Sequence, residues 1–428
     1  MGPYIINADV VNDSAATDRL VAALERNQRW WLLRVGALSG ETVQRQNGMI
    51  WIDSPTATTS MYVPFPTFHA DRVGAELDAF VAIVRGKQAQ RPIWLWASEP
   101  QVPVDLPLRL MARGFRHGFE PHWMWLDLAN LRDDFKLRRE TRITFDPDLP
   151  TWDPEKNADF IAEGRLAKEH PDRACQAIAW VDGAPIGTAC AFLTRGSNGI
   201  AGIYDVGVLP EYRNIGIGKA LTHAVCVWAR DRGYRTAGLN ATPMGEPVYR
   251  GLGFQSLRWA QTWQYPIDVQ NLPLTDEQVQ FAEAIGSGDV ETLERDSLQF
   301  EALVNESFPC RRTPFQIAAL FGQEMSAEWL VAHGATVDLL STWEIGWVDR
   351  ARDLAVTHPE LVNARSGGDW DLTPLHEAAK RGDLPLIQLL IDAGADVQAR
   401  DKTFGGRPIE WAGHFGQPEA AALLKSVM

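Results

Sequence analysis

The stretch that most constrains the fold of this 428-residue chain runs from Gly202 to Phe254. It begins with a β-branched run over residues 203–208, continues through a glycine-containing loop, and enters a helical pattern at Lys219. The first N–H groups of a helix have no internal partner and the helix dipole is positive there, so such a loop can hold phosphate groups. Gly216 and Gly218 let the backbone come close to phosphate oxygens, where a Cβ would collide. We therefore expect a strand, an anion-binding loop and a helix in this order, although an ordinary strand-to-helix turn has the same pattern.

A second motif follows this loop. Residues 236–240 have the pattern of a strand, and a short helix after them contains Tyr249, Gly253 and Phe254. The two motifs together resemble the GNAT family of N-acetyltransferases, whose acetyl-CoA loop reads Gln/Arg-x-x-Gly-x-Gly/Ala and whose next helix ends in Tyr-x-x-x-Gly-Phe. The residues that match the loop pattern are Arg213, Gly216 and Gly218.

The resemblance implies that acetyl-CoA is the co-substrate and lies across residues 206–220. Backbone groups of Val206 and Val208 would pair with the pantetheine arm. The diphosphate would be held by the loop and the first turn of the helix, which comprise Arg213, Asn214, Ile215, Gly216, Ile217, Gly218 and Lys219.

Transfer of an acetyl group to an amine requires an unprotonated amine near the thioester and a proton for the departing thiolate. Tyr249 matches the proton donor of the family, and its alternative role is that of a packing aromatic at the end of a helix. Asn240 ends the second strand and by analogy binds the pantetheine arm or a water, or else forms the following turn.

The sequence leaves the general base open. Asp205 is the only carboxylate on the cofactor strand, and its rivals are Tyr204 and a chain of waters. Neighbouring residues of a regular strand face opposite sides, so at most one of Tyr204 and Asp205 points at the substrate. An aspartate that satisfies a neighbouring loop would fit the same position, and we interpret Glu211 as a solvated loop charge.

The same order of elements occurs earlier in the chain. A strand over residues 92–97 and a helix that ends at Gly114-Phe115 parallel the second motif. The chemistry is missing, because Asp71 and Glu76 lie where the phosphate loop should be and Met111 replaces the tyrosine. The carboxylates would repel a diphosphate or complement a helix N-terminus. We predict a GNAT-like first half without activity that ends with the strand at residues 123–128, and a second half whose sheet is closed by residues 261–265.

From Thr275 onward the pattern changes. The sequence Thr-Pro-Phe-Gln-Ile-Ala-Ala at Thr313 recurs as Thr-Pro-Leu-His-Glu-Ala-Ala at Thr373, and a weaker echo begins at Arg407. These segments resemble ankyrin repeats, in which threonine caps the first helix and proline occupies its first turn. The spacing of 60 residues between the two clear copies predicts an irregular repeat between them. An opening repeat is expected at residues 277–305, and His376 is interpreted as a structural residue of the repeat.

The predicted fold class is therefore α/β, with two GNAT-like mixed-sheet domains in tandem followed by an all-α ankyrin-repeat solenoid. The expected domains are residues 1–132, residues 133–267 and residues 275–428. A chain of this length is too long for a single core.

The charge distribution of the chain limits the classes of partner that we expect. The net charge of −14 is carried almost entirely from residue 275 onward, where 25 acidic residues face 12 basic ones. This acidity argues against nucleic acid and favours a cationic partner or simple solubility. No apolar stretch is long enough to span a membrane and no signal peptide begins the chain, so we expect a cytoplasmic protein. Neither a metal site nor a disulfide framework is expected, because Cys-x-x-Cys pairs and ligand spacing are absent among Cys175, Cys190, Cys226, Cys310, His117, His122 and His170.

These observations predict an acetyl-CoA-dependent N-acetyltransferase. The favoured acceptor is a small cationic molecule such as an amine antibiotic, for which the strand tryptophans could form an aromatic wall. The alternative is an interaction protein whose ankyrin array binds a partner while the GNAT domain acetylates a protein or peptide amine or only senses acetyl-CoA. As a third possibility, the solenoid packs on the catalytic half or a second copy. The tryptophans in question are Trp94, Trp96, Trp123, Trp125, Trp259 and Trp263.

Overall fold

The computed structural model of the chain describes most of its residues, which fall into two compact units. The sheet unit holds the described residues up to 104 together with residues 117–270, and the repeat unit holds residues 105–116 and the chain from residue 272. The described ranges are 14–38, 42–46, 49–53, 61–69, 71–87, 92–98, 101–136, 140–145, 158–242, 245–270, 272, 274–367 and 370–428. None of the helices in these ranges is both long and apolar enough to cross a membrane.

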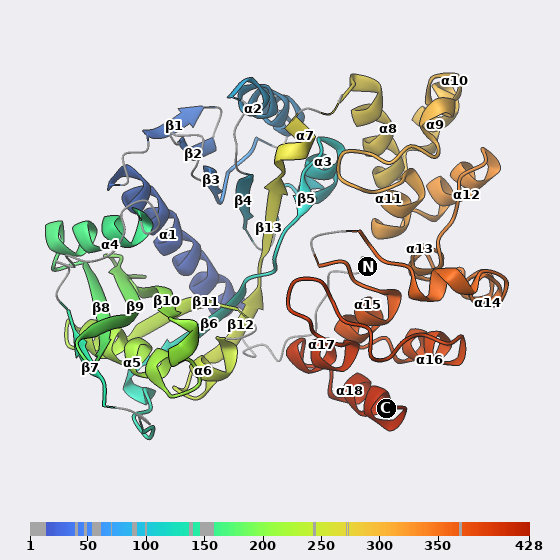
Figure 1. Cartoon of the computed structure of the whole chain (residues 1–428). Helices are drawn as coiled ribbons and strands as arrows, with labels where there is room; N and C mark the ends of the chain where they lie inside the picture. Colours follow the sequence, from blue (N-terminus) through green and yellow to red (C-terminus); the bar gives the residue numbers. More distant parts are fainter. Residues whose placement is uncertain are drawn as a thin grey trace. The chain divides into compact units, whose positions relative to one another are not determined.

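The second sheet has seven strands, and it contains the motifs singled out above (Figure 1). Its strands β10 and β11 are parallel, and their neighbours are antiparallel to them. From one edge to the other the order is β12 (Gln255–Trp259), β6 (His122–Asp127), β11 (Thr236–Ala241), β10 (Ala201–Val208), β9 (Ala184–Leu193), β8 (Ala174–Val181) and β7 (Arg142–Thr144).

The first sheet has six strands, with a parallel pair between β3 and β4. Their order is β1 (Thr42–Gln46), β2 (Met49–Asp53), β3 (Met61–Pro64), β4 (Ile93–Ala97), β13 (Gln261–Tyr265) and β5 (Arg116–His117). Two mixed sheets followed by a helical region confirm the predicted fold class. The boundaries expected at residues 132 and 267 remain a prediction.

The two sheets exchange a strand, which the sequence analysis assigned wrongly. The strand predicted to end the first half, β6, lies inside the second sheet between β12 and β11. The strand predicted to close the second sheet, β13, pairs with β4 of the first sheet, from Gln261 opposite Ala97 to Tyr265 opposite Ile93. Residue alternation along a strand specifies which side chains share a face, but the backbone bonds to any neighbouring strand, so the pattern leaves the partner open.

Helices cover both faces of the second sheet. One face carries α5 (Ile217–Arg230) and α6 (Glu246–Arg250), which bury a core with alternate residues of the strands. The other face carries α4 (Ala158–Glu169) and the first helix of the chain, α1 (Ser14–Leu38), whose Trp31 packs against Phe192 and the α4 core. The first half therefore supplies one strand of the second sheet, β6, and one of the helices that cover the sheet, α1.

The helix of the first sheet, α2 (Val73–Lys87), has no open anion site at its start. Glu76 is buried in its first turn and accepts hydrogen bonds from the backbone N–H of His69 at 3.2 Å and from its ring at 2.8 Å. The negative charge of this carboxylate in the first turn would repel a phosphate. This agrees with the prediction that Glu76 complements a helix N-terminus.

One residue of the first half was aligned wrongly with the catalytic motif. The carbonyl of Leu110 accepts from the N–H of Phe115 at 3.0 Å, as the carbonyl of Tyr249 accepts from that of Phe254 at 3.1 Å. A glycine with positive φ precedes each phenylalanine. Leu110, and not Met111, therefore stands in place of Tyr249, because both helices end in the same hydrogen-bonded turn.

The repeat unit contains five successive helix pairs in its described residues. The pair that the sequence left unspecified is α13 and α14, and it begins at Asp338, whose carboxylate caps the helix where the clear copies have threonine. The pairs are α8 (Asp276–Ser287) with α9 (Val290–Arg295), α11 (Pro314–Leu320) with α12 (Glu324–Ala332), α13 (Leu339–Glu344) with α14 (Val348–Thr357), α15 (Pro374–Arg381) with α16 (Leu384–Asp392), and α17 (Pro408–His414) with α18 (Pro418–Ser426). The short helix α10 (Ser297–Phe300) follows the first pair, and α7 (Ile267–Gln270) ends the sheet unit.

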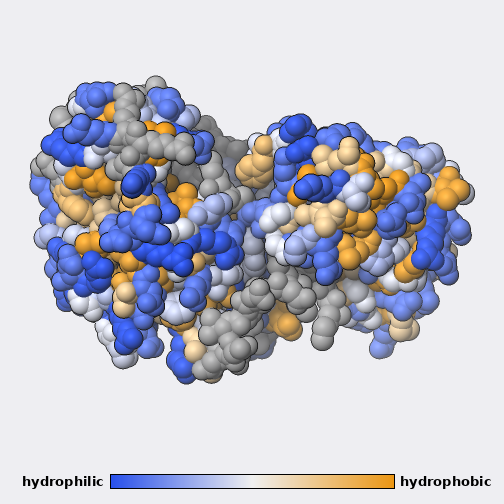
Figure 2. Space-filling view, turned by 90° about the horizontal axis from the view of Figure 1, so that it is seen from below, coloured by the Kyte–Doolittle hydropathy of each residue, from blue (hydrophilic) through white to orange (hydrophobic). Residues whose placement is uncertain are grey.

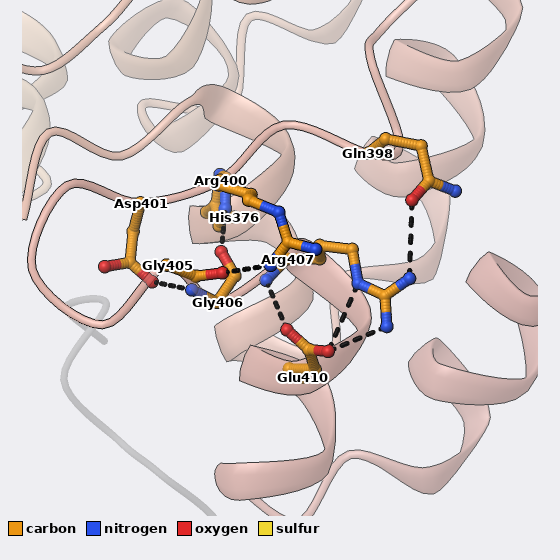
Figure 3. Close-up of polar contacts among 8 residues, drawn as sticks. All are labelled: His376, Gln398, Arg400, Asp401, Gly405, Gly406, Arg407 and Glu410. Atoms are coloured by element: carbon orange, nitrogen blue, oxygen red, sulfur yellow. Dashed lines mark hydrogen bonds and ion pairs between the residues drawn. The ribbon is translucent and has the colours of Figure 1, made fainter.

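His376 has the structural role predicted for it (Figure 3). One ring nitrogen lies 2.7 Å from the hydroxyl of Thr373, and the other lies 3.1 Å from the carbonyl of Gly406 in the next repeat. The buried carboxylate of Asp401 accepts from the N–H groups of Thr403, Phe404 and Gly406 and from the indole of Trp411. These contacts join one repeat to the next and leave the ring no free nitrogen for chemistry.

A helix of the first half also belongs to the repeat unit. This helix, α3 (Leu106–Ala112), packs on α8, where a Cβ added at Gly286 would lie 2.2 Å from Leu108. Arg113 is 3% exposed and donates to the carboxylate of Glu283 at 2.6 Å. The first helix pair of the array is therefore covered by a segment that lies far away in the sequence.

Candidate functional site

The cofactor strand β10 is interrupted by a β-bulge at Asp205. Tyr204 pairs with Cys190 and Gly207 with Thr188, so Asp205 and Val206 together face the single residue Ala189. Asp205 has a φ of 52° and an exposed side chain. Because a bulge redirects the side chain that it displaces, the simple alternation assumed for Tyr204 and Asp205 does not hold here.

Beyond the bulge, β10 separates from its parallel neighbour. The described residues pair β10 with β11 only at Ala201 with Ala237 and at Gly202 with Gly238. Val206 and Val208 lie past this point, on the part of β10 that has no register partner in β11. Backbone groups on that side of the strand are available to a ligand, as predicted for a pantetheine arm.

The loop after β10 ends at the N-terminus of α5. Asn214 and Gly216 have φ values of 63° and 94°, and Gly216 is the residue that precedes the first helical turn. A Cβ added at Gly218 would meet only a methyl group of Val208, at 3.8 Å, so the space before this turn is open. Backbone N–H groups that face open space at the start of a 14-residue helix suit a diphosphate, so this site fits acetyl-CoA.

The other predicted loop residues hold this turn in place. The guanidinium Nε of Arg213 donates to the carbonyl of Val208 at 3.0 Å, which ties the loop to the end of the strand. Ile215 and Ile217 pack on the core of the second sheet, and Ile217 is fully buried. The Lys219 ammonium lies 5.6 Å from the centre of the Phe135 ring.

Tyr249 lies in α6, where its ring is buried against Phe254 and Gly245. Burial and, next, the negative charge of Asp205 raise the pKa of Tyr249 to about 12. The phenol therefore keeps its proton at neutral pH, which a proton donor requires. The electrostatic effect also shows that the structure brings Asp205 and Tyr249 to the same region.

The side chain of Tyr204, the alternative to Asp205 as the general base, is engaged in contacts with α1. Its hydroxyl donates to Asn27 on α1 at 2.6 Å, and its ring stacks on Trp31 at 4.7 Å. Burial, followed by the charge of Asp205, raises the pKa of Tyr204 well above its ordinary value. A phenol that is buried, bonded and hard to ionise is a poor base, so Asp205 is the better placed of the two.

Asn240 contacts α1 rather than a turn. Its amide nitrogen donates to the side chain of Gln28 at 2.7 Å. Its amide oxygen is buried and has no hydrogen-bond partner in the described residues. Asn240 therefore presents a free acceptor near the point where β10 and β11 separate.

Sequence reasoning missed a polar pair that holds α6. His122 on β6 is buried, stacks on Trp259 at 4.3 Å and lies 2.6 Å from the hydroxyl of Ser256. Its other ring nitrogen lies 3.5 Å from the carboxylate of Glu246, which is one turn before Tyr249. Burial opposes ionisation of this carboxyl, but the nearby His122 ring and the hydrogen bond from Arg250 lower the pKa of Glu246 to about 2. The sequence analysis considered His122 only as a possible metal ligand. The signal that could have drawn attention to Glu246 was its spacing of three residues from Tyr249.

The described residues contain no group of three or more His, Cys, Asp or Glu side chains that could hold a metal ion. The four cysteines are free and buried.

Comparison with known proteins agrees with this geometry. Residues 125–254 match the profile of the acetyltransferase (GNAT) family, and residues 370–402 match the ankyrin repeat. Mycothiol acetyltransferase of Actinosynnema mirum is 30% identical over 208 residues, which cover 46% of this chain and 62% of that protein. Glucosamine 6-phosphate N-acetyltransferase of Trypanosoma brucei brucei is 38% identical over 63 residues, which cover 15% of this chain and 43% of that protein. The chain thus spans less than two thirds of either relative.

Among solved structures, a GCN5-related N-acetyltransferase from Kribbella flavida gives a TM-score of 0.41 at 15% identity, with 60% of this chain and 97% of that one covered.

Parallel strands that separate beside an open helix N-terminus are an arrangement suited to a phosphate-bearing co-substrate. The segment at residues 125–254 is a domain of the GNAT acetyltransferase family, and the chain carries an ankyrin repeat behind it.

Proposed function

We propose that this protein is an acetyl-CoA-dependent N-acetyltransferase that acts on the amine of a small molecule within a ternary complex. The observation that carries the proposal is the separation of β10 from β11 beside the open N-terminus of α5, with the protonated Tyr249 phenol in the next helix. A split sheet, an anion site and a proton donor are the three parts that such a transfer requires.

Each residue has a distinct task in this proposal. The loop amides at Gly216–Lys219 bind the diphosphate, and the free edge of β10 at Val206 and Val208 binds the pantetheine arm. The amine forms a bond to the acetyl carbon as the carbon–sulfur bond breaks. The thiolate takes the proton of Tyr249, and the amine loses its proton to Asp205, directly or through water.

The acceptor and the cellular context belong to the proposal as well. An amine antibiotic is the acceptor that the sequence analysis favoured, in a resistance or detoxifying role in the cytoplasm. The acidic repeat unit would bind a cationic protein or peptide.

Calorimetry with acetyl-CoA tests the site. Gly218→Glu is the informative variant, because its backbone needs no positive φ and only Val208 is near the new Cβ, so the carboxylate would enter the phosphate space without disturbing the fold. We expect the dissociation constant for acetyl-CoA to rise at least tenfold, about 1.4 kcal/mol. The control is Gly86→Glu in α2, where the added side chain also meets open space. Absence of acetyl-CoA binding to the parent protein, or equal binding by both variants, would contradict the proposal.

The second candidate function is that of an interaction protein, which the ankyrin match favours. Release of coenzyme A in the presence of an amine panel distinguishes the two. Turnover supports the enzyme, whereas acetyl-CoA binding without turnover of any amine supports a sensor attached to a binding array.

A further inference from the structure

Buried hydrogen-bonding atoms without partners gather where α1 covers the second sheet. In the described residues, three such donors are the indole N–H groups of Trp96 and Trp123 and the Nε of Arg29. The amide oxygen of Asn240 is a buried acceptor without a partner. Buried polar groups in proteins are almost always hydrogen-bonded, so a set of four calls for an explanation.

The residues that own these atoms are neighbours in space. Asn240 donates to Gln28 at 2.7 Å and pairs with Trp123 across the sheet. The Trp123 ring lies 6.4 Å from that of Phe65, whose carbonyl accepts from Arg29. The Trp96 ring lies 6.2 Å from the same phenylalanine. Since Arg29 follows Gln28 on α1, the contacts close into a ring, which we call the α1 cluster: Gln28, Arg29, Phe65, Trp96, Trp123 and Asn240.

The α1 cluster adjoins the proposed transfer site. Asn240 lies on β11 two residues after Gly238, the last residue that pairs with β10. The strands separate from there onward, so the amide oxygen of Asn240 is close to where a thioester would lie. The face is the opposite one from Tyr249, which packs in the core under α5 and α6. An acceptor amine approaching from the α1 cluster would meet the thioester from the side away from its proton donor.

We propose that the α1 cluster is the acceptor subsite and that it selects amines carrying a carboxylate group. This inference rests on the proposed acetyltransferase function and deepens it by naming a class of acceptor, which replaces the amine antibiotic that the sequence analysis favoured. Arg29 and the two indole N–H groups donate to the carboxylate, and the oxygen of Asn240 accepts from the amine that is acetylated.

The charges around the α1 cluster support a ligand of this class. Burial lowers the pKa of Arg29, which means that its cation lacks part of the solvation it has in water, while the charge of Glu25 one turn earlier acts in the opposite direction. A carboxylate would compensate the partly buried guanidinium, whereas a polycation without an anionic group would be repelled by it. The cluster therefore argues against the polycationic amine antibiotics that the sequence analysis favoured.

The experiment compares amino acids with their amides as acetyl acceptors. A panel of the common L-amino acids and the matching amino-acid amides is assayed for coenzyme A release with saturating acetyl-CoA. The amine of an amide is the less basic of each pair, so without recognition of the carboxylate the amides would react faster at neutral pH. We expect the acids to have the higher kcat/KM. Faster turnover of the amides, or turnover of neither while acetyl-CoA still binds, would overturn the subsite.

Two variants test the donors. Arg29→Gln removes the charge, and Trp123→Phe removes one N–H while keeping an aromatic ring. Each should lower kcat/KM for the preferred acid by about 10- to 100-fold, lower that for the matching amide by less, and leave the affinity for acetyl-CoA nearly unchanged. The control is Arg34→Gln, an exposed arginine on the same helix whose guanidinium lies over Trp30. Equal losses for acid and amide in both folded variants would overturn the assignment.

The two proposals fail in different ways. If acetyl-CoA does not bind the parent protein, the proposed function fails first. If acetyl-CoA binds and amines are acetylated without preference for a carboxylate, only the acceptor subsite fails.

Discussion

The surroundings of the Tyr249 phenol determine its pKa and therefore the role proposed for it. Tyrosine ordinarily ionises near pH 10, but burial and the charge of Asp205 raise the pKa of Tyr249 to about 12. The strand that carries Asp205 also carries Tyr204, whose hydroxyl donates to Asn27 and whose ring stacks on Trp31. Two tyrosines of the second half thus have different roles, because one contacts the core beneath α6 and the other supports α1.

Tyr249→Phe should lower kcat by about 100-fold or more without changing the affinity for acetyl-CoA, because only the transferable proton is lost. Tyr234→Phe, at a partly exposed position after α5, is the control and should be neutral. In the parent enzyme, the pH profile of kcat should show no decrease from ionisation of Tyr249 below about pH 11. A Tyr249→Phe variant with full activity would contradict the assignment.

The raised pKa also has a consequence for stability. A phenol whose pKa is higher in the folded state stabilises that state at pH values below its unfolded pKa, near 10. This contribution is lost as the pH rises from about 10 to about 12.

At the scale of elements, α6 depends on a strand of the first half. His122 on β6 contacts Glu246 on α6 and Ser256 on β12. The helix has five residues and little intrinsic stability, so its position comes from such tertiary contacts. The strand exchange that places β6 between β11 and β12 is therefore a requirement of the proposed catalytic site.

His122→Ala should lower the free energy of unfolding by about 1 to 3 kcal/mol, because the largely buried carboxylate of Glu246 loses a partner. Glu246 has a lowered pKa, so its contribution is complete above about pH 4.5 and is lost as the pH falls toward 2. Denaturant unfolding at pH 7 and pH 3 measures this, and the loss caused by His122→Ala should be smaller at pH 3. His170→Ala, at a partly exposed position just after α4, is the control. Equal losses at both pH values would contradict the role of the pair.

At the scale of the whole molecule, the repeats and the GNAT-like halves are not independent segments of the chain. Residues 105–116 lie between strands of the first sheet in sequence, yet they belong to the compact unit formed by the repeats. The hydrogen bond from the buried Arg113 to the partly exposed Glu283 and the contact of Leu108 with Gly286 hold α3 on α8. The face in Figure 2 carries hydrophilic and hydrophobic residues side by side, and the repeat unit exposes large apolar side chains at Leu298, Met325, Val356 and Phe404.

A chain that ends at residue 270 should therefore be less stable than the parent and aggregate more readily. Removal of the repeats leaves the apolar face of α3 without cover and takes away the carboxylate to which Arg113 donates, so the truncated chain loses apolar burial as well as this contact. Thermal unfolding and light scattering measure the effect. The full chain with Glu283→Gln, which keeps the cover and removes the charge, should fall between the two. A truncated chain as stable as the parent would show that α3 does not need the array.

The sequence alone identified the segments whose chemistry is local. The glycine loop, the Tyr-x-x-x-Gly-Phe turn and the Thr-Pro starts of the repeats are specified by residues next to one another, so Gly216, Tyr249 and Thr373 could be found without a structure. Even the irregular repeat was expected, although Asp338 at its start carried no Thr-Pro signal.

The features that only the tertiary structure decided depend on contacts between residues that are far apart in the sequence. The pairing of β6 with β11, the pairing of β13 with β4, the cover of α3 by α8, and the contact of Asn240 with Gln28 on α1 join segments separated by more than a hundred residues. Strand and helix patterns specify which face of an element is apolar, and many partners can cover such a face. The choice among them comes from packing of the complete chain, which no local pattern contains.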